Sequence, residues 1–594
     1  MLNKFLFVFI LTLSGAAFGQ YTYEYDTLSI QTRMLGLVDS VDANSGILPT
    51  TFDGGVGILN QQGFSLTRLN NDFGGQRFNV SVPKQNMKFS ALPFIGFSYS
   101  FGGQGTQFIR ANYVQAFTDS VVLNVDYAGN IGNGFLRNAT FRSNRVNANL
   151  EWKGKWYTMK FGGAYYLDTL DHNGGATSNV VNGFTTDSII ETFGLEFVNI
   201  NKSNAAARNS YGNAFLSNYF HLNSGSTNRL GIVSHHEYDI KYRAFHEFSD
   251  TLSNLYNQIN IDSISTYDRV NLARVQNFGG VFFARQKKYI DFKIGHTYWS
   301  NLTLGNDFDT TEIDVASDLR WDIGSILIRN SFKQNIYGGF GALKEEASIE
   351  FDQSKWNFGG RLAIHRSAPL PFQRSYFANN YAYQLTDIKL ENRLNLGGNL
   401  SYRIKGDSVL AGVFVNSLTI RNAYIFEDTL WNQTGSLDAL QLGVHGQFEL
   451  GKFHFHPRAI YSIESNGYLP QFQAYARMYF KSTVFKAKKL LLLIGVDGSY
   501  ISSYQPRNFV PSMDAYTWNL NTTATKGMAN AHFFTTIEIS TFRFFVRYEN
   551  IGYFWNDKAI SEYHNYPIAG QRIRMGLAWT CLLYTSPSPR DSSP

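Results

Sequence analysis

The stretch RVNANLEWKGKWYTMKFGGAY, residues 145–165, alternates apolar and polar side chains on both sides of a tight turn at 153–155. Its apolar positions are Val146, Ala148, Leu150, Trp152, Tyr157, Met159, Phe161, Gly163 and Tyr165. Successive side chains on a strand point to opposite faces, so the pattern predicts a hairpin with one apolar and one polar wall. Each run lasts about 9–11 residues, the length that a tilted strand needs to cross a bilayer. Strands of a soluble sandwich alternate in the same way over shorter runs.

The same alternation recurs to the end of the chain, and the connections between the runs alternate in length. Short connections occur at 153–155, 285–288, 322–324, 353–355, 405–407 and 451–452. Long polar connections occur at 168–187, 248–268, 338–346, 369–387, 426–437, 503–526 and 553–567. Short periplasmic turns and long extracellular loops are typical of bacterial outer-membrane barrels. We therefore predict an all-β fold, a closed antiparallel transmembrane β-barrel with an even number of strands, about 18–24.

The two ends of the chain do not follow this pattern. Residues 1–19 combine Lys4, an apolar core and small residues before Gln20, which predicts a cleaved secretory signal peptide. Residues 20–89 are irregular, and the sequence leaves open a periplasmic segment, a partial plug or the first strands. The barrel is expected over 90–580. Residues 581–594, CLLYTSPSPRDSSP, resemble a translated transposase sequencing adapter, and we expect them to be an artefact.

Composition narrows the class of protein. Aromatic residues make up 16% of the chain, with 52 Gly but only 13 Pro, and mean hydropathy is −0.22. Outside the leader no apolar run approaches the roughly 18 residues of a transmembrane helix. The net charge of +6 is not gathered into a basic patch, so no nucleic-acid partner is expected. The single cysteine, Cys581, lies in the adapter-like tail, which leaves no disulfide to consider.

One part of the chain resembles a known family. The stretch LPFIGFSYSFGGQGTQFIRANYVQAFTDSVVLNVDY (92–127) runs from an aromatic strand through a Gly turn, and FLRNATFRSNRVNANLEWKGKWY (135–157) follows. Together they resemble the putative porin family of Bacteroidota outer membranes. The resemblance implies an outer-membrane barrel acting as a passive channel and carries no site residues. Barrels of this kind usually end in an aromatic residue, whereas here Trp579-Thr580 runs into the tail.

Charged residues on the polar face of two regions are the candidate lumen lining. They are Arg229, Glu237, Asp239, Lys241, Arg243, Glu538, Arg543, Arg547 and Glu549. Rings of charge set ion selectivity in pores, but such charges can also pair with one another and only solvate the interior. No catalytic, cofactor or metal site is predicted. His454 and His456 lack a third ligand, and Ser234 and His235 are neighbours that point opposite ways on a strand.

The function expected from these features is passive diffusion of small hydrophilic solutes or ions through a polar lumen, with loops 248–268 and 503–526 folded in as constrictions. A non-conducting barrel for adhesion or scaffolding and a substrate-specific transporter are the alternatives. The expected partners are outer-membrane lipid and lipopolysaccharide, the barrel-assembly machinery and the solutes themselves, and an oligomer stays open. The expected location is the bacterial outer membrane.

Overall fold

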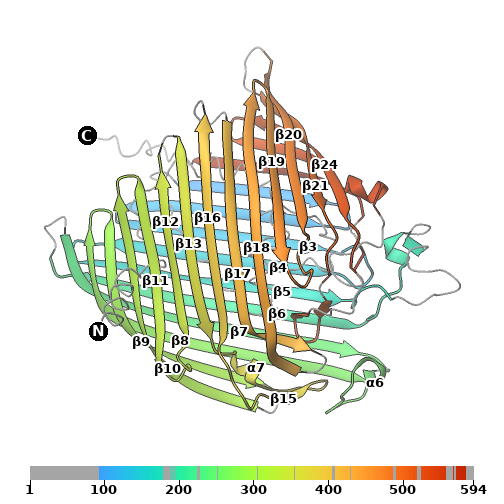
Figure 1. Cartoon of the computed structure of the whole chain (residues 1–594), viewed down its shortest axis with the longest axis horizontal. Helices are drawn as coiled ribbons and strands as arrows, with labels where there is room; N and C mark the ends of the chain where they lie inside the picture. The colour runs from blue at the N-terminus through green and yellow to red at the C-terminus, as the bar shows by residue number, and fades with distance from the viewer. Residues whose placement is uncertain are drawn as a thin grey trace, which may run out of the picture.

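A computed structural model describes residues 93–582 apart from short gaps at 119, 178–188, 191–193, 224–227, 251, 304–305, 354, 405–408, 428–429, 486–489, 507, 518–523, 557–565 and 568–569. Within these residues one sheet of twenty-two antiparallel strands closes on itself (Figure 1). The strand number is even and falls inside the predicted range. The expected signal peptide and the irregular segment 20–89 lie outside the described residues, as does most of the adapter-like tail.

The barrel strands follow one another around the wall in chain order. They are β1 (Phe94–Gly102), β2 (Gln107–Thr118), β3 (Val121–Gly132), β4 (Phe141–Lys153), β5 (Tyr157–His172), β6 (Ala205–His221), β7 (Asn228–Phe248), β8 (Ser265–Arg285), β9 (Lys288–Thr303), β10 (Asn306–Ile323), β11 (Ile326–Tyr337), β12 (Leu343–Asp352), β13 (Trp356–Ser367), β16 (Glu391–Ile404), β17 (Val409–Glu427), β18 (Leu430–Leu450), β19 (Phe453–Glu464), β20 (Phe472–Val484), β21 (Leu490–Ile501), β24 (Met528–Ile539), β25 (Phe542–Glu549) and β26 (Arg572–Leu582).

Small elements lie in the connections. They are η2 (Leu195–Phe197), α6 (Leu252–Leu255), α7 (Pro371–Arg374), η3 (Ile551–Phe554), the hairpin β14 (Ser375–Phe377) with β15 (Ala382–Gln384), and the hairpin β22 (Asn508–Val510) with β23 (Ala515–Thr517). None of the helices described is long and apolar enough to cross a membrane.

Closure is made by the first and last strands of the barrel. Strand β1 pairs with β2 on one side and with β26 on the other, where Phe94 is opposite Leu582 and Ile95 is opposite Cys581. Because every strand has two neighbours, no backbone edge is left to face lipid, where unpaired N–H and C=O groups are costly. The closed barrel was predicted from this requirement and is confirmed.

The hairpin that suggested the fold is β4–β5, and its two faces separate as expected. Val146, Trp152 and Phe161 are exposed on the outer face, while Arg145 and Glu151 are buried on the inner one. Leu150 and Phe161 are directly opposite in the register, so the apolar positions of the two strands lie side by side. The alternation of period two therefore places apolar side chains toward lipid and polar ones toward the lumen.

Connection lengths also separate by end, with two short exceptions, one between Thr303 of β9 and Asn306 of β10 and one between β17 and β18. Connections from even- to odd-numbered strands up to β13 are short, and the long ones lie at the opposite end (Figure 1). The predicted long loop at 426–437 is wrong, because β17 and β18 continue to Glu427 and Leu430 and pair to their tips. Two register shifts, between Ile420 and Ala423 and between Ala423 and Ile425, interrupt the alternation there. A bulge adds an unpaired residue, so the apolar and polar residues of the strand no longer alternate regularly in the sequence.

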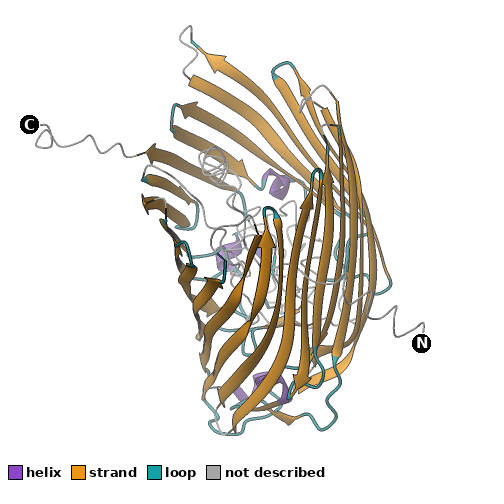
Figure 2. Cartoon of the chain, turned by 90° about the vertical axis from the view of Figure 1, so that its left-hand side faces the viewer, coloured by secondary structure: helices purple, strands orange, loops and turns teal. Residues whose placement is uncertain are grey.

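Several long connections turn back into the barrel instead of extending away from it. Figure 2, turned by 90° from Figure 1, shows short helical turns and loop segments inside the ring of strands. The interior of the barrel is therefore shaped by two sets of residues, the inward positions of the strands and the folded-in connections. Both sets are needed to describe the lumen.

Candidate functional site

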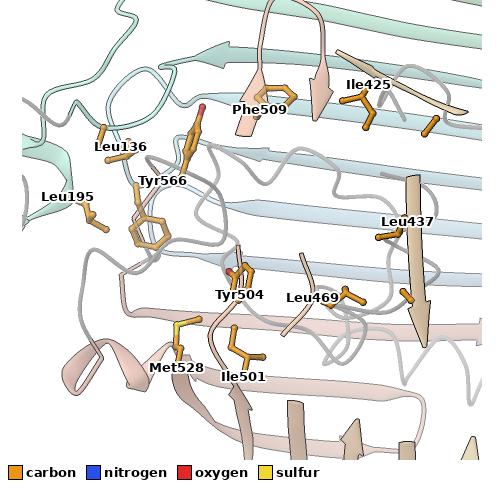
Figure 3. Packing of buried hydrophobic residues seen from close by; sticks show 14 of the residues in the cluster. Leu136, Leu195, Ile425, Leu437, Leu469, Ile501, Tyr504, Phe509, Met528 and Tyr566 are labelled. Carbon is orange, nitrogen blue, oxygen red and sulfur yellow. The ribbon is translucent and has the colours of Figure 1, made fainter. Parts of the chain in front are cut away.

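An apolar cluster crosses the lumen at the end of the barrel that carries the long connections. We call it the loop core, and it consists of Phe135, Leu136, Ala176, Ile190, Leu195, Val198, Leu418, Ile420, Ala423, Ile425, Leu437, Ala439, Leu469, Ile501, Tyr504, Phe509, Met528 and Tyr566. Figure 3 shows side chains from several connections meeting those of the wall. Burying a large apolar side chain contributes about 1.5–3 kcal/mol. Several such residues together hold the connections inside the barrel.

A second apolar cluster lies against β8. It contains Val270, Leu272, Phe372, Tyr376, Ala378, Tyr381, Tyr424, Phe426, Trp431, Met513 and Ala515. Trp431 is fully buried, and its ring meets Phe426 edge-on with 5.6 Å between ring centroids. The cluster joins the β13–β16 and β21–β24 connections to the tip of β17–β18. Both expected constriction loops contribute, 248–268 through Tyr256 and 503–526 through Met513 and Ala515.

Buried ion pairs fasten these connections to the wall. Glu247, near the end of β7, accepts a hydrogen bond from Lys202 Nζ at 2.6 Å and another from the hydroxyl of Tyr256. Lys202 Nζ also lies 3.0 Å from the hydroxyl of Tyr256. Burial raises the pKa of the Tyr256 phenol well above its usual value, so the hydroxyl keeps its proton and donates to Glu247. The β5–β6 and β7–β8 connections are thus tied to one carboxylate.

Two further connections are tied to the neighbouring part of the same wall. Arg243 donates from Nη2 to the backbone oxygen of Pro511 at 2.6 Å, and the backbone N–H of Asn379 donates to Asp268 Oδ1 at 3.0 Å. The hydroxyls of Tyr381 and Ser512 are 2.9 Å apart. Arg243, predicted as a lumen-lining charge, therefore contacts the β21–β24 connection. Its role in ion selectivity stays a prediction.

The other predicted residues of β7 lie at inward positions of the strand. Asp239 is buried and accepts from Arg274 Nε at 2.7 Å, and Glu237 lies 3.4 Å from the same guanidinium. Lys241 Nζ is 5.7 Å from the centre of the Tyr211 ring. Arg229, at the start of β7, is exposed. The inward charges of this strand engage neighbouring strands, which is the charge-pairing alternative considered from the sequence.

The predicted residues of β24 and β25 form a second paired group. Arg543 Nη2 lies 2.7 Å from Glu538, and Arg547 lies 3.1 Å from Asp497 and 3.3 Å from Glu549. Glu549, 1% exposed, also accepts from Arg572 Nε at 2.6 Å and from Arg574. Three guanidiniums thus surround one carboxylate. We call the inner faces of β7, β8 and β24–β26 the packed wall.

The inner faces of β12–β20 outside the loop core differ, and we call this part the open wall. It lines a recess of about 690 Å³ bordered by Arg361, Asn395, Asn399, Asn416, His445 and Arg458, none of which the sequence singled out. Asn416, His445 and Arg458 lie nearer the short-turn ends of their strands, Arg361 and Asn399 lie near mid-strand, and Asn395 lies nearer the end with the long connections. The sequence feature that could have indicated the recess is the repetition of Asn and Gly at alternate positions of 391–404. An ordinary polar strand face has the same pattern.

The histidines that the sequence analysis considered, His454 and His235, contact nearby side chains of the barrel wall. His454 Nδ1 lies 3.4 Å from Glu449, and its ring stacks on Tyr479. Among the described residues no group of three or more His, Cys, Asp or Glu could hold a metal ion.

The serine that contacts His235 is Ser217 and not the adjacent Ser234. Ser217 Oγ lies 2.7 Å from His235 Nδ1, and His235 Nε2 lies 3.2 Å from Glu237. Strand pairing of β6 with β7 makes this contact, which sequence spacing could not show. Ser217 is buried, so its hydroxyl serves to join the two strands.

These features define a bacterial outer-membrane β-barrel with a polar lumen and folded-in loops. The chain belongs to the family described as "Putative porin", whose model matches residues 78–581. The resemblance of residues 92–157 to a putative porin family is thereby confirmed. The description of this family names a porin, which is a channel protein, and names no enzymatic activity.

Solved structures with the same fold are known at low identity. The FrpB iron transporter of Neisseria meningitidis is 8% identical over 83% of each chain, with a TM-score of 0.56. A ferric enterobactin receptor (PfeA) mutant from Pseudomonas aeruginosa is 9% identical over 83% of this chain and 81% of that one, with a TM-score of 0.56. The ferric-catecholate import receptor Fiu of E. coli is 9% identical over 83% and 82%, with a TM-score of 0.55. These likenesses show the fold alone. No curated protein matches the chain.

Proposed function

We propose that this protein is an outer-membrane channel through which small hydrophilic solutes diffuse passively, with the folded-in connections restricting the path at the extracellular end. The observation that carries the proposal is the division of the lumen. The end with the long connections is crossed by the loop core, and beside it the open wall keeps a polar recess that extends from mid-strand toward the short turns. Diffusion along a polar wall needs no catalytic residue and no cofactor.

The inner surface supports this proposal chemically. Along β12, β13 and β16 the inward residues include Ser348, Glu350, Arg361, Asn395 and Asn399, which offer hydrogen bonds to water or to hydroxylated solutes. Outer positions of the same strands carry exposed apolar side chains such as Ile349, Phe358 and Leu396, as expected of a surface that faces lipid. A solute that loses part of its hydration in the lumen can recover those hydrogen bonds from the wall.

A substrate-specific transporter is the second candidate function, and one observation favours it. Barrels of 22 strands are wide enough that outer-membrane transporters of this size carry a plugged lumen. Here the strand number is the same and the connections crowd one end of the lumen. The FrpB, PfeA and Fiu likenesses are consistent with this candidate only through the shared fold.

The decisive experiment compares the conductance of the refolded wild type with that of a loop variant in planar bilayers. In the loop variant residues 506–523, which carry Phe509, Met513 and Ala515, are replaced by a short Gly-Ser linker. We expect small, steady conductance steps from the wild type and steps several times larger from the variant, because both apolar clusters lose contributors. Heat-modifiable migration on gels checks that each barrel is folded.

A matched control replaces 338–342, the β11–β12 connection at the same end, which contributes to neither apolar cluster. This control should conduct like the wild type. A folded wild type that never conducts, together with a conducting loop variant, would favour the transporter. Absence of conductance in both folded proteins would rule out a channel of either kind and favour a scaffold.

A further inference from the structure

The recess in the open wall is bordered by strands that span a wide arc of the barrel. Arg361 lies on β13 and Arg458 on β19, with β16, β17 and β18 between them. Neighbouring strands are about 4.8 Å apart, so the backbone positions of the two arginines are separated by about 19 Å across the strands. The registers also offset them along the strand, because the row of Arg361 continues to Ser462 and not to Arg458. The recess is therefore an elongated hollow and not a point site.

Glycine makes room for this hollow. Gly359 is directly opposite Asn399 in the β13–β16 register, and Gly397 is directly opposite Asn416 in the β16–β17 register. A Cβ at Gly359 would come within 2.3 Å of the Asn399 side-chain oxygen, and one at Gly397 within 2.8 Å of the Asn416 oxygen. Each amide thus lies flat across the neighbouring glycine, which keeps the centre of the recess open while lining it with hydrogen-bonding groups.

The recess has an excess of positive charge. Its carboxylate, Glu350, is 3.5 Å from Arg329 on the neighbouring strand β11, outside the recess. Arg361 is exposed to the lumen and, among the residues that the structure describes, forms no ion pair. The guanidinium of Arg458 lies over the Phe414 ring, 5.1 Å from its centre. The recess thus holds two guanidiniums and one carboxylate, and that carboxylate contacts Arg329.

This combination of groups matches one class of solute. Guanidinium groups bind carboxylate and phosphate oxygens in bidentate fashion. Asparagine amides offer donors and acceptors together, which is what sugar hydroxyls require. The backbone positions of Arg361 and Arg458, four strands apart, are farther from each other than one sugar ring is wide. We propose that the recess binds short acidic oligosaccharides, with charged groups toward the two arginines and hydroxyls on the asparagines between them.

This proposal rests on the channel function proposed above and names the class of solute that the channel would carry. Binding can be measured without measuring conductance. Calorimetric titration of the folded protein in detergent micelles measures binding of trigalacturonate, with maltotriose as a neutral sugar of equal length and galacturonate as the monomer. We expect binding of trigalacturonate, at least tenfold weaker binding of galacturonate, and none of maltotriose.

Variants locate the site. Arg361→Gln and Arg458→Gln should each weaken trigalacturonate binding at least tenfold. Arg421→Gln is the matched control, because Arg421 pairs with Asp438 at 2.8 Å outside the recess, and it should bind like the wild type. Heat-modifiable migration confirms folding, and Arg361→Lys provides a second variant that keeps the charge and should retain part of the binding.

The outcomes separate this proposal from the channel function. No binding of trigalacturonate to the folded wild type, or equal binding of maltotriose, would overturn the acidic-oligosaccharide site even if the barrel conducts. Binding that is lost in Arg361→Gln but accompanied by no conductance would support the site and overturn passive diffusion. Equal loss in the Arg421→Gln control would show that the arginines act only through general charge and would also overturn the site.

Discussion

The packed wall and the open wall are built by the same alternation of residues, yet their inward charges have different surroundings. Glu549 on the packed wall is 1% exposed and contacts three guanidiniums, whereas the Glu350 side chain on the open wall is 51% exposed and lies 3.5 Å from one. The difference follows from the neighbours of each carboxylate, which are three buried arginines at Glu549 and one partly exposed arginine at Glu350. The comparison teaches that period-two patterning identifies an inward residue but not whether water reaches it.

The largest expected effect comes from Glu549→Gln. Removing this charge leaves Arg547, Arg572 and Arg574 close together without their shared carboxylate, and breaking a buried ion pair costs about 3–5 kcal/mol. Urea unfolding of the barrel in detergent, followed by tryptophan fluorescence, should show the lower free energy of unfolding. An unchanged midpoint would mean that the packed wall is wetter than the burial of Glu549 indicates.

An intermediate effect is expected from Tyr256→Phe. The variant removes a hydrogen bond to the buried carboxylate of Glu247, and bonds to charged groups contribute about 1.5–3 kcal/mol. Because Tyr256 lies in a connection, we expect local loosening, measured as faster amide hydrogen exchange over 252–264. Tyr337→Phe, at an exposed tyrosine of the same end, is the control. Equal exchange in both variants would show that the hydroxyl does not fasten the connection.

The smallest effect is expected from Glu350→Gln. Its partner Arg329 is also partly exposed, and exposed ion pairs contribute about 0.2–1 kcal/mol. The unfolding midpoint should therefore move little in the same urea experiment, while loss of the negative charge should shift the reversal potential of the channel toward anions. A loss of stability as large as that of Glu549→Gln would erase the distinction between the two walls.

Much of the fold could be predicted from the sequence because the barrel follows local rules. Alternation over residues 145–165 identified the lipid and lumen faces, and the need to pair every backbone group required closure. The prediction at 426–437 was wrong because bulges near Ala423 break the two-residue period by which a strand is recognised in a sequence. Local pattern is reliable only where the strand is regular.

The site was less predictable because its contacts join residues that are far apart in sequence. Sequence reasoning placed Arg243 on the polar face, but its contact with Pro511 depends on how a distant connection folds. In the same way, Ser217 meets His235 only through the β6–β7 register. The recess escaped notice because its glycines and asparagines carry no motif, and their meaning appears only when neighbouring strands are aligned.

The seam between β1 and β26 has a consequence for how the protein is made. The pairing of β1 with β26, where Phe97 is opposite Trp579, joins the two ends of the barrel sequence, so it is the most non-local pairing of the sheet. Non-local pairings slow folding, and until they form both edge strands offer bare backbone to any other strand nearby. The growing barrel must therefore be shielded from aggregation until its last strand arrives. Substitutions at the seam should affect the yield of assembled protein before they affect its finished architecture.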